Sequence, residues 1–274
     1  MKRYSKYADV VSLSSKTDYK MALFQSSNPA LSEKKFTSTV IPDVLNMENA
    51  MTVRGALQKF GFLLIMVLAS SFYSWKQFAE GGSVNGMIWT GALGGLAVAI
   101  TITFKKEWSP FLAPIYALLE GLFLGAISAM YNNAFAERAP NLVINAVGLT
   151  MGVAVAMYLL YSFRIIKATE KFKSVIITAT VGIGVFYLVV MVLRMFGFEN
   201  MPFLHEGSTF GIIFSLVVTA VAALNLILDF DMIERGSEMG APKYMEWYGA
   251  FGLMVTIVWL YLEILRLLSK ISKR

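Results

Sequence analysis

Residues 210–228 read FGIIFSLVVTAVAALNLIL, a run of 19 residues that contains no charged side chain. As an α-helix this run is about 28 Å long, close to the roughly 30 Å thickness of the hydrocarbon core of a bilayer. Inside lipid every backbone polar group must be satisfied within the protein, and a helix satisfies almost all of them internally. The run therefore predicts a transmembrane helix.

Six further apolar runs of similar length occur along the chain, separated by short polar loops. They cover residues 57–75, 87–104, 111–130, 142–163, 175–195 and 247–268. The runs are too long for the strands of a membrane barrel and lack their alternation. A chain of 274 residues is also too short to bury seven such helices in a soluble core. We therefore predict an all-α integral membrane protein with a bundle of seven transmembrane helices.

The composition excludes several classes of function. Hydrophobic residues make up 57% of the chain and charged residues 15%, whereas a soluble domain carries about 25% charged residues. Cysteine is absent and His205 is the sole histidine, which excludes disulfides and metal sites built from thiolates or several histidines. No phosphate-binding loop, zinc-helix motif, nucleophile elbow or dinucleotide fingerprint occurs. We expect no enzymatic activity, no cofactor and no resident metal.

The basic residues bear on orientation. The formal net charge is +6, but the lysines and arginines are spread over the N-terminal tail and the loops. Such a distribution is typical of membrane orientation and not of nucleic-acid binding. The basic residues at the start of the first run and after the second, fourth and sixth runs predict a cytoplasmic N-terminus. The basic C-terminal cluster would then lie outside, which leaves the side of the C-terminus open: Arg266, Lys270, Lys273 and Arg274.

The first 50 residues differ from the rest of the chain. They are polar, rich in Ser and Lys, and have no sustained apolar period. They predict a disordered cytoplasmic tail ahead of a membrane domain at residues 51–274. Their basic start is not followed by the apolar core and cleavage site of a signal peptide. The lack of targeting signals favours the bacterial cytoplasmic membrane as the location of this multi-pass protein.

Pairs of glycines at four-residue spacing occur inside three of the runs. In lipid, small residues allow two helix backbones to approach closely, so such pairs favour helix contacts. We expect packing contacts within the bundle at three pairs: Gly91 and Gly95, Gly121 and Gly125, and Gly148 and Gly152.

Ionisable side chains inside the apolar runs are few. One such group at the bilayer centre costs about 2.5–3.5 kcal/mol on insertion scales, so each is a candidate functional residue. Glu120 lies in the middle of the third run, in LLEGLFLG, and must face protein or water. It is either part of a functional site or a protonated carboxyl group that is hydrogen-bonded to a neighbouring helix.

Asp229 closes the sixth run. Asn225 lies one turn earlier on the same helical face, and Ser215 lies further along that face, so the sixth helix is predicted to carry a polar stripe. Asp231 is about 200° around the helix from Asp229 and cannot share this face. We expect Asp231 to pair with Arg235 at i+4 instead.

Glu263 lies within the seventh run and shares a helical face with Thr256 and Trp259. Arg266, three residues later, is an available partner for its carboxylate. Glu263 is therefore either half of a local ion pair or part of a transport site.

Several segments carry a family resemblance: NLILDFDMIERG from Asn225, EWYGAFGL from Glu246 and WLYLEILRLL from Trp259. Together with LLEGLFLG they resemble the Bax inhibitor-one (transmembrane Bax inhibitor motif) family, and most of all its bacterial YccA-like branch. The resemblance extends from about residue 50 to the C-terminus. It implies a seven-helix fold in which the last helix is central.

For some members the resemblance also implies a pH-sensitive calcium leak governed by two intramembrane acids, which map by motif onto Asp229 and Glu263. Two carboxyl groups in one low-dielectric site share a proton, so their protonation could lock or release helix packing. Calcium, as a transported ion, prefers oxygen ligands, and leak sites are weak and transient. The candidate oxygen donors are Asp229, Asn225, Glu120 and Glu263.

The resemblance also leaves open an alternative function. The chain could be a non-conducting membrane regulator that binds a membrane-embedded protease or another membrane protein. The polar tail would then be the segment that such a partner binds. Under both hypotheses the lipid bilayer is a partner and nucleic acid is not.

Overall fold

The computed structural model describes residues 50–197 and 208–273. The predicted disordered tail, apart from Ala50, lies outside the described residues, as do His205 and Arg274.

Within these ranges the chain forms seven long helices, each long and apolar enough to cross a membrane. This finding confirms the predicted all-α fold. A short 3₁₀ helix, η2 (Lys106–Trp108), precedes the third long helix. The long helices are α3 (Val53–Ala79), α4 (Asn85–Phe104), α5 (Ser109–Ala134), α6 (Leu142–Ser162), α7 (Glu170–Met195), α8 (Thr209–Glu238) and α9 (Met245–Ser272).

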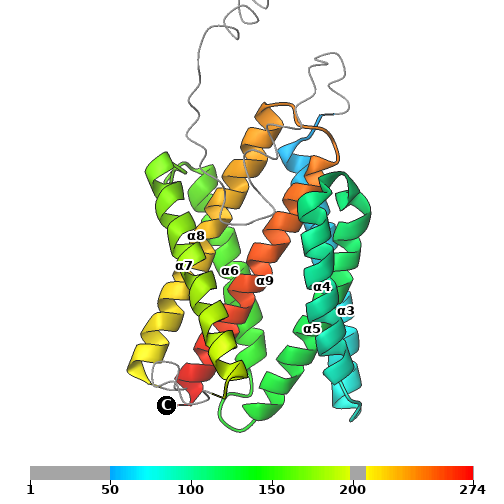
Figure 1. Ribbon diagram of the computed structural model, residues 1–274, viewed down its shortest axis with the longest axis vertical. Helices are drawn as coiled ribbons and strands as arrows, with labels where there is room; N and C mark the ends of the chain where they lie inside the picture. The colour runs from blue at the N-terminus through cyan, green and yellow to red at the C-terminus, as the bar shows by residue number, and fades with distance from the viewer. Residues whose placement is uncertain (1–49, 198–207, 274) are drawn as a thin grey trace, which may run out of the picture.

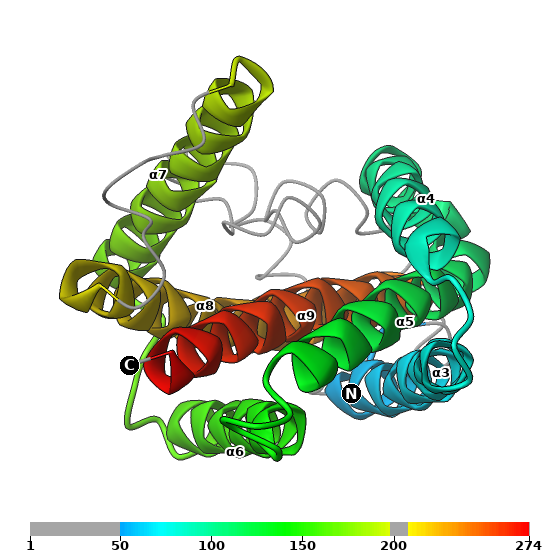
Figure 2. The ribbon, with the colours of Figure 1, turned by 90° about the horizontal axis from the view of Figure 1, so that it is seen from below.

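Helix α9 lies at the centre of the bundle. Figure 2 shows it crossing the middle of the protein, with α5, α6 and α8 around it and α7 extending away at one corner. In α9, 67% of the most apolar window is buried inside the protein, against 11% in α7. The predicted central position of the last helix is confirmed, and α7 has the largest surface left for lipid.

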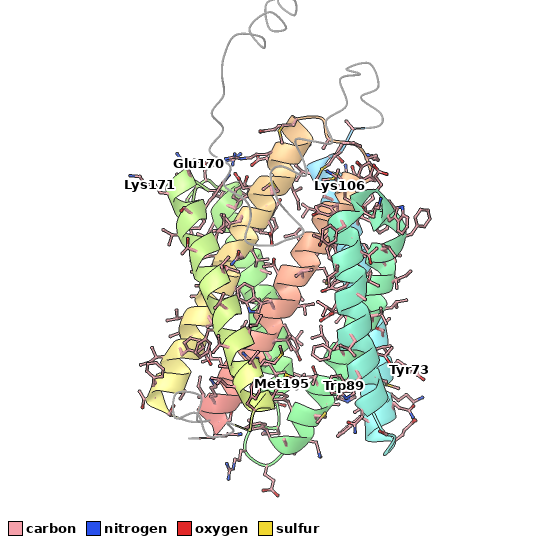
Figure 3. All side chains as sticks on the ribbon, in the orientation of Figure 1. Tyr73, Trp89, Lys106, Glu170, Lys171 and Met195 are labelled. Carbon is pink, nitrogen blue, oxygen red and sulfur yellow. The ribbon has the colours of Figure 1, made fainter. Side chains whose placement is uncertain are left out.

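The helices run alternately up and down, so the start of α3 and the end of α9 lie at opposite ends of the bundle (Figure 1). Figure 3 shows Lys106, Glu170 and Lys171 at the end where α3 begins, and Tyr73 and Trp89 toward the other end. We call the first of these the basic end. The C-terminal side, which the sequence left open, is therefore opposite the basic end.

Glycine contacts hold α5 against its neighbours. A Cβ at Gly121 would overlap Ser70 Oγ, and one at Gly125 would lie 2.6 Å from the Cα of Ser71, so both positions require glycine where α5 meets α3. A Cβ at Gly91 of α4 would lie 2.6 Å from the backbone oxygen of Leu119. The prediction of helix contacts is confirmed at these sites, because small residues permit this close approach.

The same prediction is wrong for the pair in α6. A Cβ at Gly148 or Gly152 would meet nothing within 4 Å, and both residues are exposed. The physical reason is rotational: the four-residue spacing puts two glycines on one helix face, but it does not say which face turns toward the bundle.

Candidate functional site

Asp229 lies inside α8, because this helix continues past the end of the sixth apolar run to Glu238. Its side chain is fully buried, and Oδ2 accepts a 2.5 Å hydrogen bond from Thr256 Oγ1 of α9. A buried carboxyl group needs such a donor, because an unsatisfied one would be strongly destabilising. The Asp229–Thr256 contact thus joins α8 to the central helix.

Asn225 lies one turn before Asp229 and is also buried. Its amide donates to Thr180 Oγ1 of α7 over 2.9 Å and to the backbone oxygen of Val221 over 2.8 Å. Ser215, which was placed on the same stripe, is 1% exposed. The predicted polar stripe of the sixth helix therefore faces the interior, where α7 and α9 provide its partners.

Glu263 is 2% exposed and lies in a three-residue cluster. Arg266 Nη1 donates to Glu263 Oε1 over 3.0 Å, and the hydroxyl of Tyr187 in α7 donates to the same oxygen over 3.0 Å. Arg266 also donates to the Tyr187 hydroxyl over 2.6 Å. The local Arg266 partner suggested by the sequence is present, and Tyr187 extends the pair into a latch between α7 and α9.

Asp229 and Glu263 occupy different levels of the bundle. Asp229 is bonded to Thr256, which is seven residues from Glu263, or about 10 Å along α9. The hydrogen bond from Lys270 of α9 to Ser215 of α8 fits the same antiparallel register of α8 against α9 as the Asp229–Thr256 bond. The same register places Glu263 at the level of Ala222. The two acids therefore lie in separate layers in this structure and do not form one hydrogen-bonded pair.

Lys270 forms a third polar layer. Its side chain is buried, and Nζ donates to Ser215 Oγ over 2.7 Å and to the backbone oxygen of Gly211 over 3.1 Å. Thr256, Glu263 and Lys270 are spaced by seven residues, which places them on one face of α9 with a drift of only about 20° per step.

These layers follow one another along the bundle, and we call them together the polar seam. It runs along the junction of α7, α8 and α9, and each layer joins at least two of these helices by side-chain hydrogen bonds. Sequence reasoning missed Thr180, Tyr187 and Lys270, although the seven-residue spacing in α9 was a usable signal for Lys270. The seam consists of Thr180, Tyr187, Ser215, Asn225, Asp229, Thr256, Glu263, Arg266 and Lys270.

Glu120 lies apart from the seam, on α5. Its side chain is 9% exposed, and Oε2 would lie 3.0 Å from a Cβ at Gly95 of α4. Glu120 lines a groove of about 450 Å³ together with Tyr116, Phe123 and residues of α4. Gly95 therefore leaves space for the carboxyl group, and Glu120 faces a neighbouring helix as the sequence required.

Asp231 lies off the polar stripe, as expected. Its Oδ2 is 2.9 Å from Nε of Arg235 and 2.8 Å from Nζ of Lys173 in α7. The predicted i+4 pair with Arg235 is confirmed, and Lys173 adds a second cation. This cluster ties α7 to α8 near the basic end. Within residues 50–197 and 208–273, no group of three or more acidic, His or Cys side chains could hold a metal ion.

A buried acid that sequence reasoning missed lies at the start of α9. Glu246 is fully buried and accepts hydrogen bonds of 2.9 Å from both the backbone N–H and the hydroxyl of Thr52, which caps α3. Lys243 lies 3.0 Å from its Oε1, and Lys59 pairs with Oε2. A Cβ at Gly55 would overlap this carboxylate. Glu246 therefore links the beginning of α3 to the beginning of α9.

Glu246→Gln is expected to lower the free energy of unfolding by about 2–3 kcal/mol, since it removes the charge that neutralises two lysines at a buried site. Glu238→Gln, at an exposed position near the end of α8, is the matched control and should change it by less than about 0.5 kcal/mol. Thermal unfolding of both variants in detergent measures the difference. Equal melting temperatures for the two would show that the Glu246 cluster contributes no net stability.

Comparison with known families supports the assignment suggested by the motifs. The family model described as Bax inhibitor 1 like matches residues 13–273. A search of curated proteins gave no match. A helical bundle of seven membrane spans with a buried polar seam around its last helix defines the class as a multi-pass membrane protein. The chain belongs to the Bax inhibitor 1-like family.

Proposed function

We propose that this protein is a pH-sensitive leak channel that conducts calcium along the polar seam. The single observation that carries the proposal is the seam itself, a row of buried and partly buried oxygen and charged groups at the junction of three membrane helices. Polar groups at this depth are expensive in lipid and typically line ion or proton pathways. The oxygens of Asp229, Asn225 and Glu263 are of the kind that calcium prefers.

The Glu263 latch provides a physical basis for the gate. Arg266 and Tyr187 both bond the Glu263 carboxylate, so the ionised acid holds α7 against α9 and keeps a cation in the pathway. Protonation of Glu263 removes the charge attraction to Arg266 and weakens this latch. Because α7 has the least buried surface of the seven helices, it is the helix that moves most easily. Flux should therefore rise as pH falls.

The orientation that we propose follows from the basic end. Lys59, Lys106, Lys171 and Lys243 lie there with Arg164, and cytoplasmic loops carry an excess of such residues. The basic end would thus face the cytoplasm of a cell membrane, together with the N-terminus. Glu263, Arg266 and Lys270 would then lie toward the external side, where Glu263 could sense external pH.

A non-conducting regulator of a membrane-embedded protease or another membrane protein is the second candidate. The observation in its favour is that the polar side chains within each layer of the seam hydrogen-bond one another, as in a purely structural core. The large lipid-facing surface of α7 would be available to a membrane partner. Conduction by the purified protein separates the two functions, because a leak needs no partner.

The test is calcium flux into liposomes that contain only the purified protein. We expect flux that rises when the external pH is lowered from about 8 to about 5, because protonation of Glu263 weakens the latch. Liposomes without protein are the control for passive leakage. Absence of protein-dependent flux at every pH in this range would reject the channel proposal and favour the regulator.

A further inference from the structure

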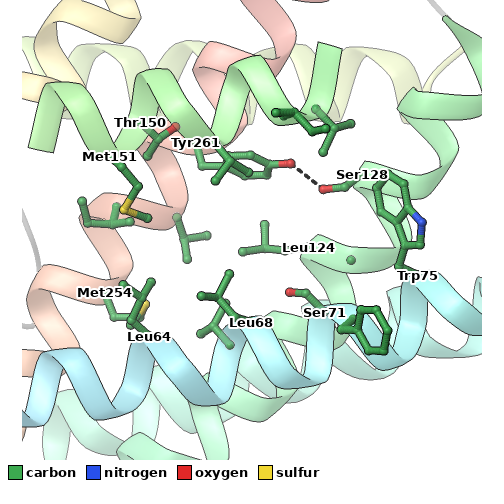
Figure 4. A pocket seen from close by; sticks show the side chains of 18 residues that line it. Leu64, Leu68, Ser71, Trp75, Leu124, Ser128, Thr150, Met151, Met254 and Tyr261 are labelled. Carbon is green, nitrogen blue, oxygen red and sulfur yellow. Dashed lines mark hydrogen bonds between the residues drawn. The ribbon is translucent and has the colours of Figure 1, made fainter. Parts of the chain in front are cut away.

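A lateral pocket of about 340 Å³ lies between α3 and α6, away from the polar seam. Residues of α5 and α9 form its floor, and Figure 4 shows Trp75 at one end with Leu64, Met151 and Met254 at the other. An unfilled apolar cavity of this size costs stability, because the side chains that line it lose contacts. Something apolar is therefore expected to fill it.

The pocket opens toward the bilayer. Phe72 of α3 and Ile144 of α6 line it and are 71% and 73% exposed, and Leu68 and Val147 beside them are also exposed. In a membrane-spanning bundle, side chains exposed at these depths contact acyl chains and not water. The molecules that can enter from this side are therefore lipids.

The length of the pocket matches one leaflet. Its lining on α3 runs from Leu64 to Trp75, about 16 Å along the helix axis, and half of the hydrocarbon core is about 15 Å. Trp75 lies four residues before the end of α3 at Ala79, where tryptophan typically marks the membrane interface. A chain that enters beside Trp75 would end near Met254, close to the middle of the membrane.

The chemistry of the lining suits a hydrocarbon chain. Its hydroxyl groups are already engaged: Ser71 donates to the backbone oxygen of Gly121 over 3.0 Å, and Thr150 donates to that of Ala146 over 2.7 Å. Ser128 and Tyr261 bond each other over 2.5 Å (Figure 4). Apolar cavities of this kind stay dry and bind apolar ligands. The site therefore selects for shape and apolar surface.

We propose that this pocket binds one acyl chain of a membrane phospholipid, from the leaflet in which α3 ends. The chain packs against Met254, Ile257 and Tyr261 of α9, on the side of the central helix that faces away from Glu263. The bound chain thereby packs against the face of α9 that is opposite the Glu263 latch. This proposal is independent of ion conduction: the phospholipid should bind whether or not the protein conducts calcium.

The test uses liposomes that contain a phosphatidylcholine with a photoreactive group at the end of one acyl chain, followed by mass spectrometry of the cross-linked peptides. We expect cross-links to Met254 and Ile257, which are buried and out of reach of lipids that only surround the bundle. Val147→Trp, which places a bulky ring at the mouth, should reduce the α9 cross-link by about tenfold, equivalent to a loss of about 1.4 kcal/mol of binding free energy. Cross-links to exposed α7 should be unchanged.

Val155→Trp is the matched control, because this valine lies on the same helix, is 57% exposed and does not line the pocket. Ile144→Trp replaces Val147→Trp if that variant does not give a monodisperse protein. Cross-links confined to exposed residues in the wild type, with none on α9, would overturn the proposal. So would an α9 cross-link of wild-type intensity in the folded Val147→Trp or Ile144→Trp variant.

Discussion

Gly125→Ala is expected to lower the free energy of unfolding by about 3 kcal/mol or more, a typical upper value for overpacking a closely packed contact. The new Cβ would lie 2.6 Å from the Cα of Ser71 and would overlap its backbone oxygen. A backbone cannot rotate aside as a side chain can, so α3 and α5 would have to separate. This separation would also weaken the hydrogen bond from Ser71 to Gly121.

Gly148→Ala is the matched control, because it makes the same change in a pair of the same spacing. A Cβ there meets nothing within 4 Å, so only helix propensity acts, and the variant should be unchanged or more stable by up to about 1 kcal/mol. Thermal unfolding and size-exclusion chromatography in detergent compare the two. Equal stability losses, or none at Gly125, would contradict the packing of α3 on α5.

The number of helices and their approximate bounds could be predicted from the sequence, because the hydrophobic requirement of the bilayer acts on each segment by itself. The ends of the helices could be predicted less well. Helix α8 runs on to Glu238, past the apolar run that ended at Leu228, because buried partners satisfy its polar last turns. Asp231 there has Arg235 and Lys173. Hydropathy alone cannot anticipate such tertiary compensation.

Single residues of the site could be predicted from the sequence, but their relative positions could not. The acids Asp229 and Glu263 and the stripe at Asn225 could be identified locally, since an ionisable or amide group within an apolar run stands out. The offset between the two acids along the bundle axis depends on the register in which α8 packs against α9. This register cannot be read from either segment alone. Tyr187 lies in another apolar run, far from both acids in the sequence. Lys270 belongs to the basic cluster at the C-terminus, so its burial could not be predicted.

The offset between the layers changes what the acid variants should do. If the acids shared one proton in direct contact, neutralising either would abolish the pH response and the double variant would match each single one. With Asp229 and Glu263 about 10 Å apart along the seam, we expect separable effects. Glu263→Gln should make calcium flux independent of pH, because Glu263 is the acid whose charge holds Arg266. Asp229→Asn should lower flux at every pH while keeping the pH response.

The latch mechanism predicts the largest difference in calcium flux between Glu263→Gln and the wild type at high pH. Glu263→Gln in liposomes at about pH 8 should conduct calcium at the rate that the wild type reaches at about pH 5, since an uncharged side chain mimics the protonated acid. Arg266→Gln removes the other half of the latch and should also raise flux at about pH 8. Glu238→Gln, on an exposed part of α8, is the control and should keep the wild-type profile. The latch mechanism would be refuted if folded Glu263→Gln retained the wild-type pH dependence, because the pH response would then come from a group other than Glu263.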